Sequence, residues 1–198
     1  MRKIRVGITG GIGTGKSLFS SFMEENGYRV IIADEISKKL MNENEQLKKR
    51  IIQEFGRQSY REEELNRKYL AQKVFSDLQK LKKINSLVHP PTIEEIKRQM
   101  KEALKRKKLV FVESAIIYDV KIESLFDYVI LLTSSEENKI KRITERDNAI
   151  REDVEKRISN QLPDKIKKGK ADFVIENDGT REELKSKAEF VLSILEQM

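Results

Sequence analysis

The chain has 198 residues, of which 38% are hydrophobic and 37% charged, which is enough apolar material for one compact domain. It contains no cysteine, which excludes disulfides, thiolate metal sites and a cysteine nucleophile. No apolar run approaches the ~20 residues that cross a bilayer. The N-terminus leads directly into an apolar strand pattern, so we expect no signal peptide, no membrane partner and a cytoplasmic location.

A phosphate-binding motif follows the first apolar run. Alternating Ile4, Val6 and Ile8 predict a buried strand, and the next residues fit the P-loop pattern of Gly, four residues, Gly-Lys and Ser or Thr. Backbone N–H groups of such a loop point at phosphate oxygens, and the following helix adds further donors. Lys16 is expected to reach the β and γ phosphates of a nucleotide, and the Ser17 hydroxyl to ligate Mg²⁺. The residues predicted to bind ATP here are Gly10, Gly11, Ile12, Gly13, Thr14, Gly15, Lys16 and Ser17.

An aspartate follows the second predicted strand. We expect a helix from about Ser17 to Glu25, closed by Gly27, and then a strand over residues 28–32 beside the P-loop strand. Asp34 follows the carboxyl end of this strand, where open α/β sheets bind their ligands. Two interpretations fit equally well. Asp34 accepts the proton of an attacking hydroxyl, or it caps a helix that starts at Glu35.

Helical periodicity dominates the segment between the second and third strands. The apolar spacing predicts three helices, over residues 35–54, 59–77 and 92–106. Pro90 and Pro91 are expected to begin the last of them. We expect this insertion to form a side domain that shapes a substrate pocket. The only histidine, His89, is interpreted as a structural hydrogen-bonding residue, with catalysis as the alternative.

Continuous apolar runs predict the remaining strands of a buried parallel sheet, over residues 109–112, 128–132 and 171–176. Glu113 ends the first of these runs. An acid at this place in P-loop proteins often helps to hold Mg²⁺, directly or through a water. Thr180, with Glu183 three residues later, predicts the capped start of the last helix.

The segment from residue 134 to 169 is helical in pattern and strongly basic. Residues 139–170 contain 11 Lys or Arg and 6 Asp or Glu, so +5 of the chain's net charge of +7 lies there. Guanidinium groups suit phosphoryl oxygens, and the candidates are Arg142, Arg146, Arg151 and Arg157. We interpret the segment as a lid over ATP, with a solubilising surface helix pair as the alternative. It has no aromatic residue, which argues against nucleic-acid binding by base stacking.

In this order, the pieces resemble the dephospho-coenzyme A kinase family over nearly the whole chain. The first half contributes the loop with its additional Gly-Gly-Ile, Ala33-Asp34, and the segments 65–67 and 84–90. The second half contributes Arg146-Asp147, Arg157-Ile158, Gln161, Lys165, Ala171-Asp172 and Asn177-Asp178-Gly179. Two departures stand out. Ala115-Ile116-Ile117 replaces the usual Pro-Leu-Leu, and Glu113 replaces the common Asp.

The resemblance implies an α/β fold of the P-loop kinase type. This is a three-layer sandwich with a five-stranded parallel sheet, a helical substrate-binding insertion and a helical lid. It forms a single domain over residues 1–198. The implied nucleotide-binding core comprises residues 1–34, 107–135 and 171–198, the CoA-substrate domain residues 35–106, and the lid residues 136–170.

The implied reaction is transfer of a phosphoryl group from ATP, with Mg²⁺, to the ribose 3′-hydroxyl of dephospho-CoA. It yields coenzyme A and ADP, in the last step of coenzyme A biosynthesis. The implied catalytic residues are Asp34 as general base, Lys16 and Arg146. The resemblance further implies ATP contacts from Arg146, Arg157, Asn177 and Gly179. It implies substrate contacts from Asp34, Arg67 and His89, and metal contacts from Ser17 and Glu113.

Two other functions remain as alternatives, a nucleoside or nucleotide kinase and a GTP-dependent switch. Against the switch, no Asn-Lys-x-Asp follows the fourth predicted strand and no Asp-x-x-Gly follows the third. The expected partners are ATP and dephospho-CoA, without nucleic acid, and the expected assembly is a monomer or weak homo-oligomer.

Overall fold

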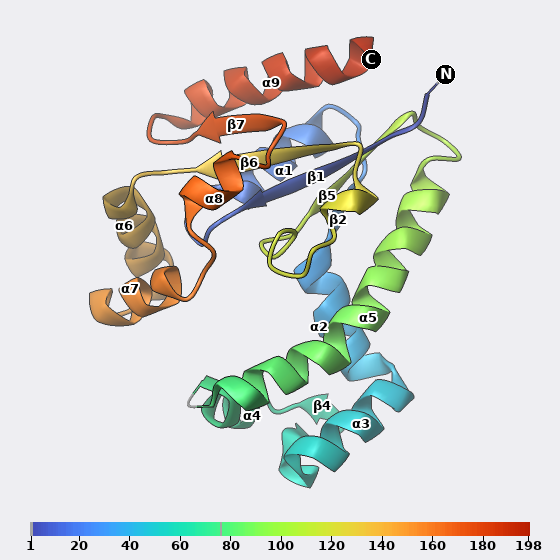
Figure 1. Ribbon diagram of the computed structural model, residues 1–198, viewed down its shortest axis with the longest axis vertical. Helices are drawn as coiled ribbons and strands as arrows, with labels where there is room; N and C mark the ends of the chain where they lie inside the picture. Colours follow the sequence, from blue (N-terminus) through green and yellow to red (C-terminus); the bar gives the residue numbers. More distant parts are fainter. Residues whose placement is uncertain (1, 76) are drawn as a thin grey trace. The chain divides into compact units, whose positions relative to one another are not determined.

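The computed structural model describes residues 2–75 and 77–198, and the chain divides into two compact units (Figure 1). The first unit consists of Met1–Ile31 and Met100–Met198, and the second is the continuous segment Ile32–Gln99. The second unit therefore interrupts the first in sequence. The assignment of core, substrate-domain and lid roles to segments of the chain stays a prediction.

A five-stranded parallel sheet organises the first unit, which confirms the predicted α/β fold. In spatial order its strands are β2 (Val30–Ile32), β5 (Leu109–Glu113), β1 (Ile4–Gly10), β6 (Tyr128–Thr133) and β7 (Phe173–Glu176). β1 pairs in parallel with both β5 and β6, so that Ile8 lies opposite Glu113 on one side and Ile130 on the other. All five residues of β5 are buried, as a central strand requires.

The prediction that the second strand lies beside the P-loop strand is wrong, because β5 separates β2 from β1. The crossover that follows β1 skips one strand position, which β5 fills later in the sequence. Strand order in the chain does not fix strand order in a sheet, since about a third of consecutive strands are not neighbours. The acid that ends a neighbour of β1 is therefore Glu113.

Helices cover both faces of this sheet. α1 (Lys16–Glu25) packs against α9 (Arg181–Gln197) and β5, and its Phe19, Phe22 and Met23 are completely buried. α8 (Asp164–Lys168) contacts β6 on the opposite face, which gives the predicted three layers (Figure 1). The predicted cap of the last helix is confirmed, because the Thr180 hydroxyl accepts a hydrogen bond from Glu183 N at 3.2 Å.

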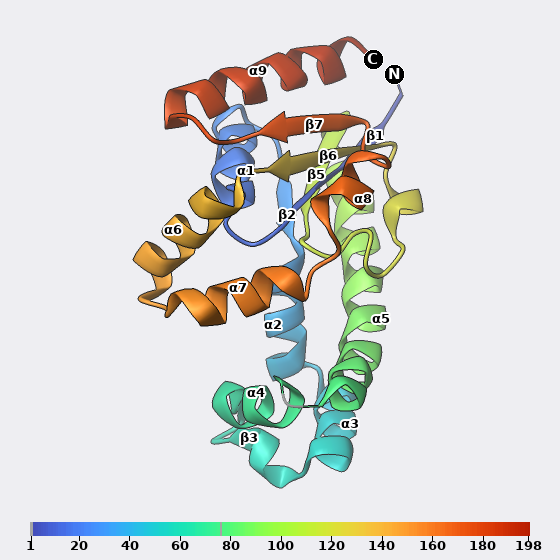
Figure 2. The same ribbon diagram turned by 60° about the vertical axis from the view of Figure 1, so that its left-hand side comes forward.

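The basic segment forms two further helices, α6 (Glu136–Asp147) and α7 (Arg151–Ser159), joined by a short turn (Figure 2). Their apolar faces enclose a small core of Ile140, Ile143 and Val154. Ile12 of the P-loop packs against this core. The helices of the basic segment are thus in direct contact with the phosphate loop.

The second unit begins with two helices where one was predicted. α2 (Ala33–Glu43) and α3 (Glu45–Phe55) are separated at Asn44. The Asn44 side chain accepts a hydrogen bond from Leu47 N at 2.9 Å, which makes it the N-cap of α3. A side chain that competes for backbone hydrogen bonds in this way interrupts a helix despite continuous apolar spacing.

A small hairpin replaces the first half of the helix predicted over residues 59–77. A 3₁₀ turn (Arg57–Ser59) leads into β3 (Tyr60–Arg61) and β4 (Glu64–Leu65), and α4 (Arg67–Phe75) follows. The two loop residues, Glu62 and Glu63, have φ of 51° and 69°. Positive φ at both positions matches the twist of a two-residue hairpin loop. Such loops usually contain Asn or Gly, and this one contains neither.

The helix predicted to begin at Thr92 in fact begins much earlier. α5 (Leu78–Ala103) runs through Pro90 and Pro91, and Figure 1 shows it bent along its length. Each proline removes one helical N–H donor, which explains the bend. The helix persists because its first half is packed into the core of the unit, formed by Leu47, Ile51, Phe55, Leu70, Leu87 and Val88.

Candidate functional site

The P-loop spans the turn between β1 and α1, which confirms the predicted strand, loop and helix. The carbonyl oxygen of Gly11 accepts two hydrogen bonds of 2.9 Å, one from the Thr14 hydroxyl and one from the Lys16 ammonium group. The ammonium group of Lys16 is therefore folded back over the loop that binds phosphate in P-loop proteins.

Two glycines of the loop are required by the protein's own packing. Gly13 has φ of 78°, and a Cβ atom there would lie 2.9 Å from the carbonyl oxygen of Lys139. Gly15 has φ of 91°, and a Cβ atom would lie 2.2 Å from the side-chain nitrogen of Asn177. Both positions combine a left-handed backbone with close contact, so only glycine fits without rearrangement.

Ser17 and Glu113, predicted separately as metal contacts, lie together. The Ser17 hydroxyl donates to Glu113 Oε1 at 3.0 Å. Glu113 is buried, and its other oxygen, Oε2, has no hydrogen-bonding partner among the described residues. An unsatisfied buried carboxylate oxygen is costly, and a hard cation beside it would remove that cost. A hydroxyl and a carboxylate are oxygen ligands of the kind Mg²⁺ uses when phosphates complete its shell, so these residues fit Mg²⁺.

The described residues contain no group of three or more His, Cys, Asp or Glu side chains that could hold a metal ion without further ligands. No helix within the described ranges is long and apolar enough to cross a membrane.

The turn after β7 is hydrogen-bonded to the P-loop. Asn177 is buried, and its side-chain nitrogen donates to the Thr14 carbonyl at 2.9 Å. Its neighbour Asp178 accepts hydrogen bonds from Ser134 Oγ at 2.6 Å and from Ser135 N at 2.8 Å, and these bonds hold the pKa of its carboxyl well below the usual range. Gly179 leaves room for the carboxylate of Glu183. The ATP contacts predicted for Asn177 and Gly179 stay predictions.

Two of the four candidate lid arginines lie at one carboxylate. Arg146 forms a two-pronged ion pair with Asp147, at 2.7 and 2.9 Å, and Arg157 lies 3.7 Å from the same group. The Arg146 hydrogen bonds lower the pKa of Asp147. Within the described residues neither arginine bonds to the P-loop, whereas Arg142 donates to the Gly13 carbonyl at 3.3 Å.

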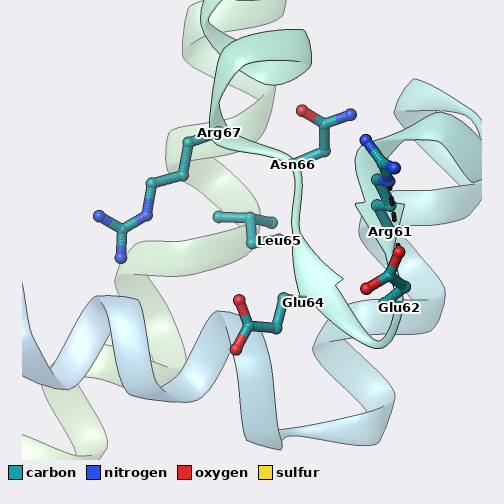
Figure 3. Close-up of a pocket in the computed structure, with 6 residues that line it drawn as sticks. All are labelled: Arg61, Glu62, Glu64, Leu65, Asn66 and Arg67. Carbon is teal, nitrogen blue, oxygen red and sulfur yellow. Dashed lines mark ion pairs between the residues drawn. The ribbon is translucent and has the colours of Figure 1, made fainter.

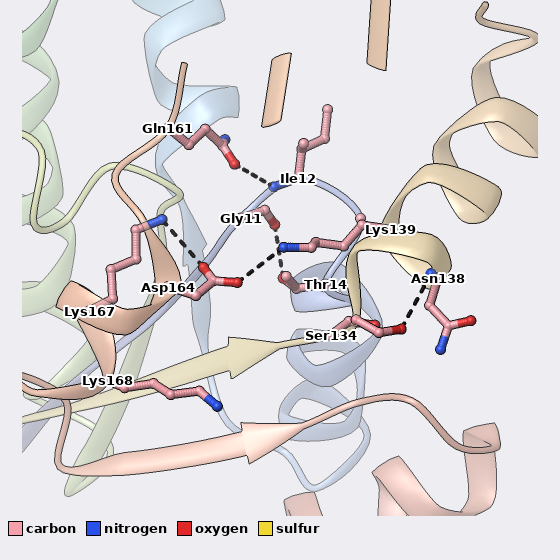
Figure 4. A network of polar contacts seen from close by, with 12 residues as sticks. Gly11, Ile12, Thr14, Ser134, Asn138, Lys139, Gln161, Asp164, Lys167 and Lys168 are labelled. Carbon is pink, nitrogen blue, oxygen red and sulfur yellow. Dashed lines mark hydrogen bonds and ion pairs between the residues drawn. The ribbon is translucent and has the colours of Figure 1, made fainter. Parts of the chain in front are cut away.

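A second polar network at the P-loop was not predicted as part of the site (Figure 4). The Gln161 side-chain oxygen accepts a hydrogen bond from Ile12 N at 3.0 Å. Asp164 accepts from Lys139 at 3.1 Å and lies 4.0 Å from the Lys167 ammonium group. Lys167 is only 1% exposed, and this burial lowers its pKa. One sign of this network is visible in the sequence, because Gln161 is among the lid residues in which the chain resembles the kinase family.

In the second unit, the structure excludes one of the two interpretations of Asp34. α2 begins one residue before Asp34, its N-cap position is Ile32, and no side chain of a described residue caps it. The capping interpretation is therefore wrong. The Asp34 carboxylate is exposed in the first helical turn and forms no hydrogen bond or ion pair with any described residue.

The predicted substrate contacts Arg67 and His89 also belong to the second unit. Arg67 lines an open hollow of about 520 Å³ at the hairpin, together with Arg61, Glu62, Glu64, Leu65 and Asn66. Figure 3 shows its guanidinium on the opposite side of the strand from the Arg61–Glu62 ion pair. His89 is half-buried in α5, and desolvation lowers its pKa, so the neutral imidazole is favoured near neutral pH.

Comparisons with known proteins agree with this geometry. The family described as dephospho-CoA kinase matches residues 4–183. The chain is 34% identical to the dephospho-CoA kinase of Salinibacter ruber over 185 residues, covering 92% of this chain and 93% of that protein.

Two solved structures are similar over almost their full length. The dephospho-CoA kinase from Campylobacter jejuni superposes with a TM-score of 0.73 at 28% identity, covering 96% of each chain. TT1252 from Thermus thermophilus gives a TM-score of 0.83 at 29% identity, covering 98% of this chain and 99% of that one. The chain belongs to the dephospho-CoA kinase family of phosphotransferases, which carry out the final step of coenzyme A biosynthesis.

Proposed function

We propose that this kinase transfers the γ-phosphoryl group of ATP, with Mg²⁺, to the ribose 3′-hydroxyl of dephospho-CoA. The observation that carries the proposal is the P-loop itself. There, the Lys16 ammonium group and the paired Ser17 and Glu113 side chains lie at one loop in a chain of this family. Positioning and charge neutralisation supply most of the rate in phosphoryl transfer, and these groups are suited to both.

The proposed roles at the nucleotide follow from this chemistry. Residues 10–17 cradle the phosphates with their N–H groups, and Lys16 neutralises charge on the β and γ phosphates. Ser17 and Glu113 would hold Mg²⁺, which when bound neutralises phosphate charge. Arg146 and Arg157 approach the transferring phosphoryl group from the lid, and closure excludes water that would otherwise accept it. Asn177 and Gly179 contribute to the nucleotide site through the turn after β7.

The proposed acceptor side uses residues of the second unit. Asp34 accepts the proton of the 3′-hydroxyl, which its exposed carboxylate without a partner among the described residues supports. Arg67 and His89 contact dephospho-CoA. The proposed assembly is a cytoplasmic monomer or weak homo-oligomer whose partners are these two small molecules.

The test is ATP consumption by the purified protein with dephospho-CoA, adenosine, cytidine, AMP and CMP in parallel, and with no acceptor. We expect turnover with dephospho-CoA alone, and a product mass that shows one added phosphoryl group. Preference for a nucleoside or nucleotide as acceptor would indicate a nucleoside or nucleotide kinase instead. Hydrolysis of ATP at the same rate without an acceptor would contradict the proposal altogether.

Replacing Glu113 with glutamine should raise the Mg²⁺ concentration needed for half-maximal activity about tenfold, because it removes one charged ligand. Initial rates at fixed ATP and varied Mg²⁺ measure this. Glu123→Gln is the matched control. It also alters a glutamate with one buried oxygen that has no hydrogen-bonding partner in the described part of the chain, but this residue lies in a 3₁₀ turn (Glu123–Leu125) outside the proposed site. An identical Mg²⁺ response in both variants would remove Glu113 from the metal site.

A further inference from the structure

One peptide unit of the P-loop connects Lys16 with Gln161. The carbonyl oxygen of Gly11 accepts a hydrogen bond from the Lys16 ammonium group at 2.9 Å. The N–H of the same peptide unit, on Ile12, donates to the Gln161 side-chain oxygen at 3.0 Å. Because a peptide unit is planar and rigid, the direction of its N–H also fixes the direction of its carbonyl. The Gln161 acceptor therefore fixes the oxygen to which Lys16 binds.

The segment that carries Gln161 is anchored beside the P-loop. Asp164, three residues later, is anchored by the hydrogen bond from Lys139 at 3.1 Å and lies 4.0 Å from the buried Lys167 ammonium group (Figure 4). The other partner is fixed as well, since the Ile12 side chain packs on the core between α6 and α7. A Cβ atom on Gly11 would lie 3.0 Å from the Gln161 oxygen, so glycine permits this close approach.

We propose that Gln161 is a positioning residue for Lys16, acting through the Gly11–Ile12 peptide unit. It turns the carbonyl of that unit toward the lysine, so that the ammonium group is oriented before ATP arrives. Gln161 comes from the segment between α7 and α8, so an ordered α7–α8 segment and a correctly oriented lysine occur together. The inference rests on the proposed role of Lys16 in phosphoryl transfer.

Two substitutions separate the hydrogen bond from simple space filling. Gln161→Glu keeps an oxygen that accepts from Ile12 N–H, whereas Gln161→Met keeps the length of the side chain and loses the acceptor. We expect kcat to fall about tenfold in the methionine variant, the usual effect of losing one hydrogen bond. We expect kcat to stay within about threefold of the native value in the glutamate variant, with the acceptor retained.

The glutamate variant also adds a negative charge near the nucleotide, which raises the KM for ATP. Asn160→Asp is the matched control, because it makes the same amide-to-carboxylate change at the neighbouring exposed residue. A similar rise in KM in both variants, with kcat preserved in both, supports a positioning role. Retention of kcat by the methionine variant, or equal loss of kcat in the glutamate and methionine variants, overturns it.

A double-mutant cycle tests whether the effect passes through Lys16. In a Lys16→Met background, measured in single turnovers, Gln161→Met should no longer lower the rate, because the group that it positions is gone. A full tenfold effect in that background would show that Gln161 acts independently of Lys16. Native turnover of dephospho-CoA in the same assay distinguishes failure of this inference from failure of the proposed function.

Discussion

Replacing Lys16 with alanine should lower kcat by at least about 1,000-fold, because it removes a fixed positive charge from the transferring phosphoryl group. The fold should survive, since β1 and α1 on either side of the loop are fixed by burial of Ile4, Val6, Ile8, Phe19 and Phe22. Turnover of dephospho-CoA at saturating ATP measures the loss, and thermal unfolding measures the fold.

Lys185→Ala is a suitable control for this experiment. It removes the same side chain from α9, where Lys185 forms a surface ion pair of 3.8 Å with Glu25. Such pairs contribute little to stability, so its turnover and its unfolding temperature should match the native protein. A Lys16→Ala protein that kept near-native turnover would remove this lysine from the mechanism.

Replacing Asp34 with asparagine should lower kcat about 100-fold, the lower end of the range for loss of a general base. The affinity for ATP should change far less, because asparagine keeps the size of the side chain and the P-loop is untouched. Steady-state turnover gives kcat, and equilibrium binding of a non-hydrolysable ATP analogue gives the affinity.

Glu35→Gln provides the matched control, because it makes the same carboxylate-to-amide change at the next exposed residue of the same helical turn. It should leave both kcat and ATP affinity unchanged. If Asp34→Asn weakened ATP binding and left kcat intact, Asp34 would be a nucleotide or metal contact in place of a base.

Local patterns predicted the features that depend on local forces. Continuous apolar runs predicted β5 and β6, because a central parallel strand is buried on both faces, and alternating Ile4, Val6 and Ile8 predicted β1. The hairpin at residues 60–65 escaped prediction because Glu62 and Glu63 adopt a backbone that sequence usually marks with Asn or Gly. The helix through Pro90 escaped because packing of the unit's core outweighs the loss of two donors.

The residues of the site also divide into those that local sequence patterns predict and those that depend on long-range contacts. The loop residues and the oxygen ligands Ser17 and Glu113 follow from the P-loop motif and a strand end, which are visible in sequence. The support from Gln161 does not, since it joins residues 149 positions apart in the chain. The prediction of strand order was wrong for a related reason, because β5 comes to lie between β2 and β1 only in the folded sheet. Long-range contacts leave no periodic signal.

The order of strands in the sheet has a consequence during synthesis. β1 is made first, yet both of its partners, β5 and β6, are made after residue 108. Residues 32–99 carry a complete core of their own and emerge from the ribosome before either partner. A nascent chain therefore exposes the apolar β1 while the second unit already has everything it needs to fold. A chain released before β7 is made would contain the whole second unit. Its P-loop would lack the hydrogen bond that Asn177 donates to the Thr14 carbonyl.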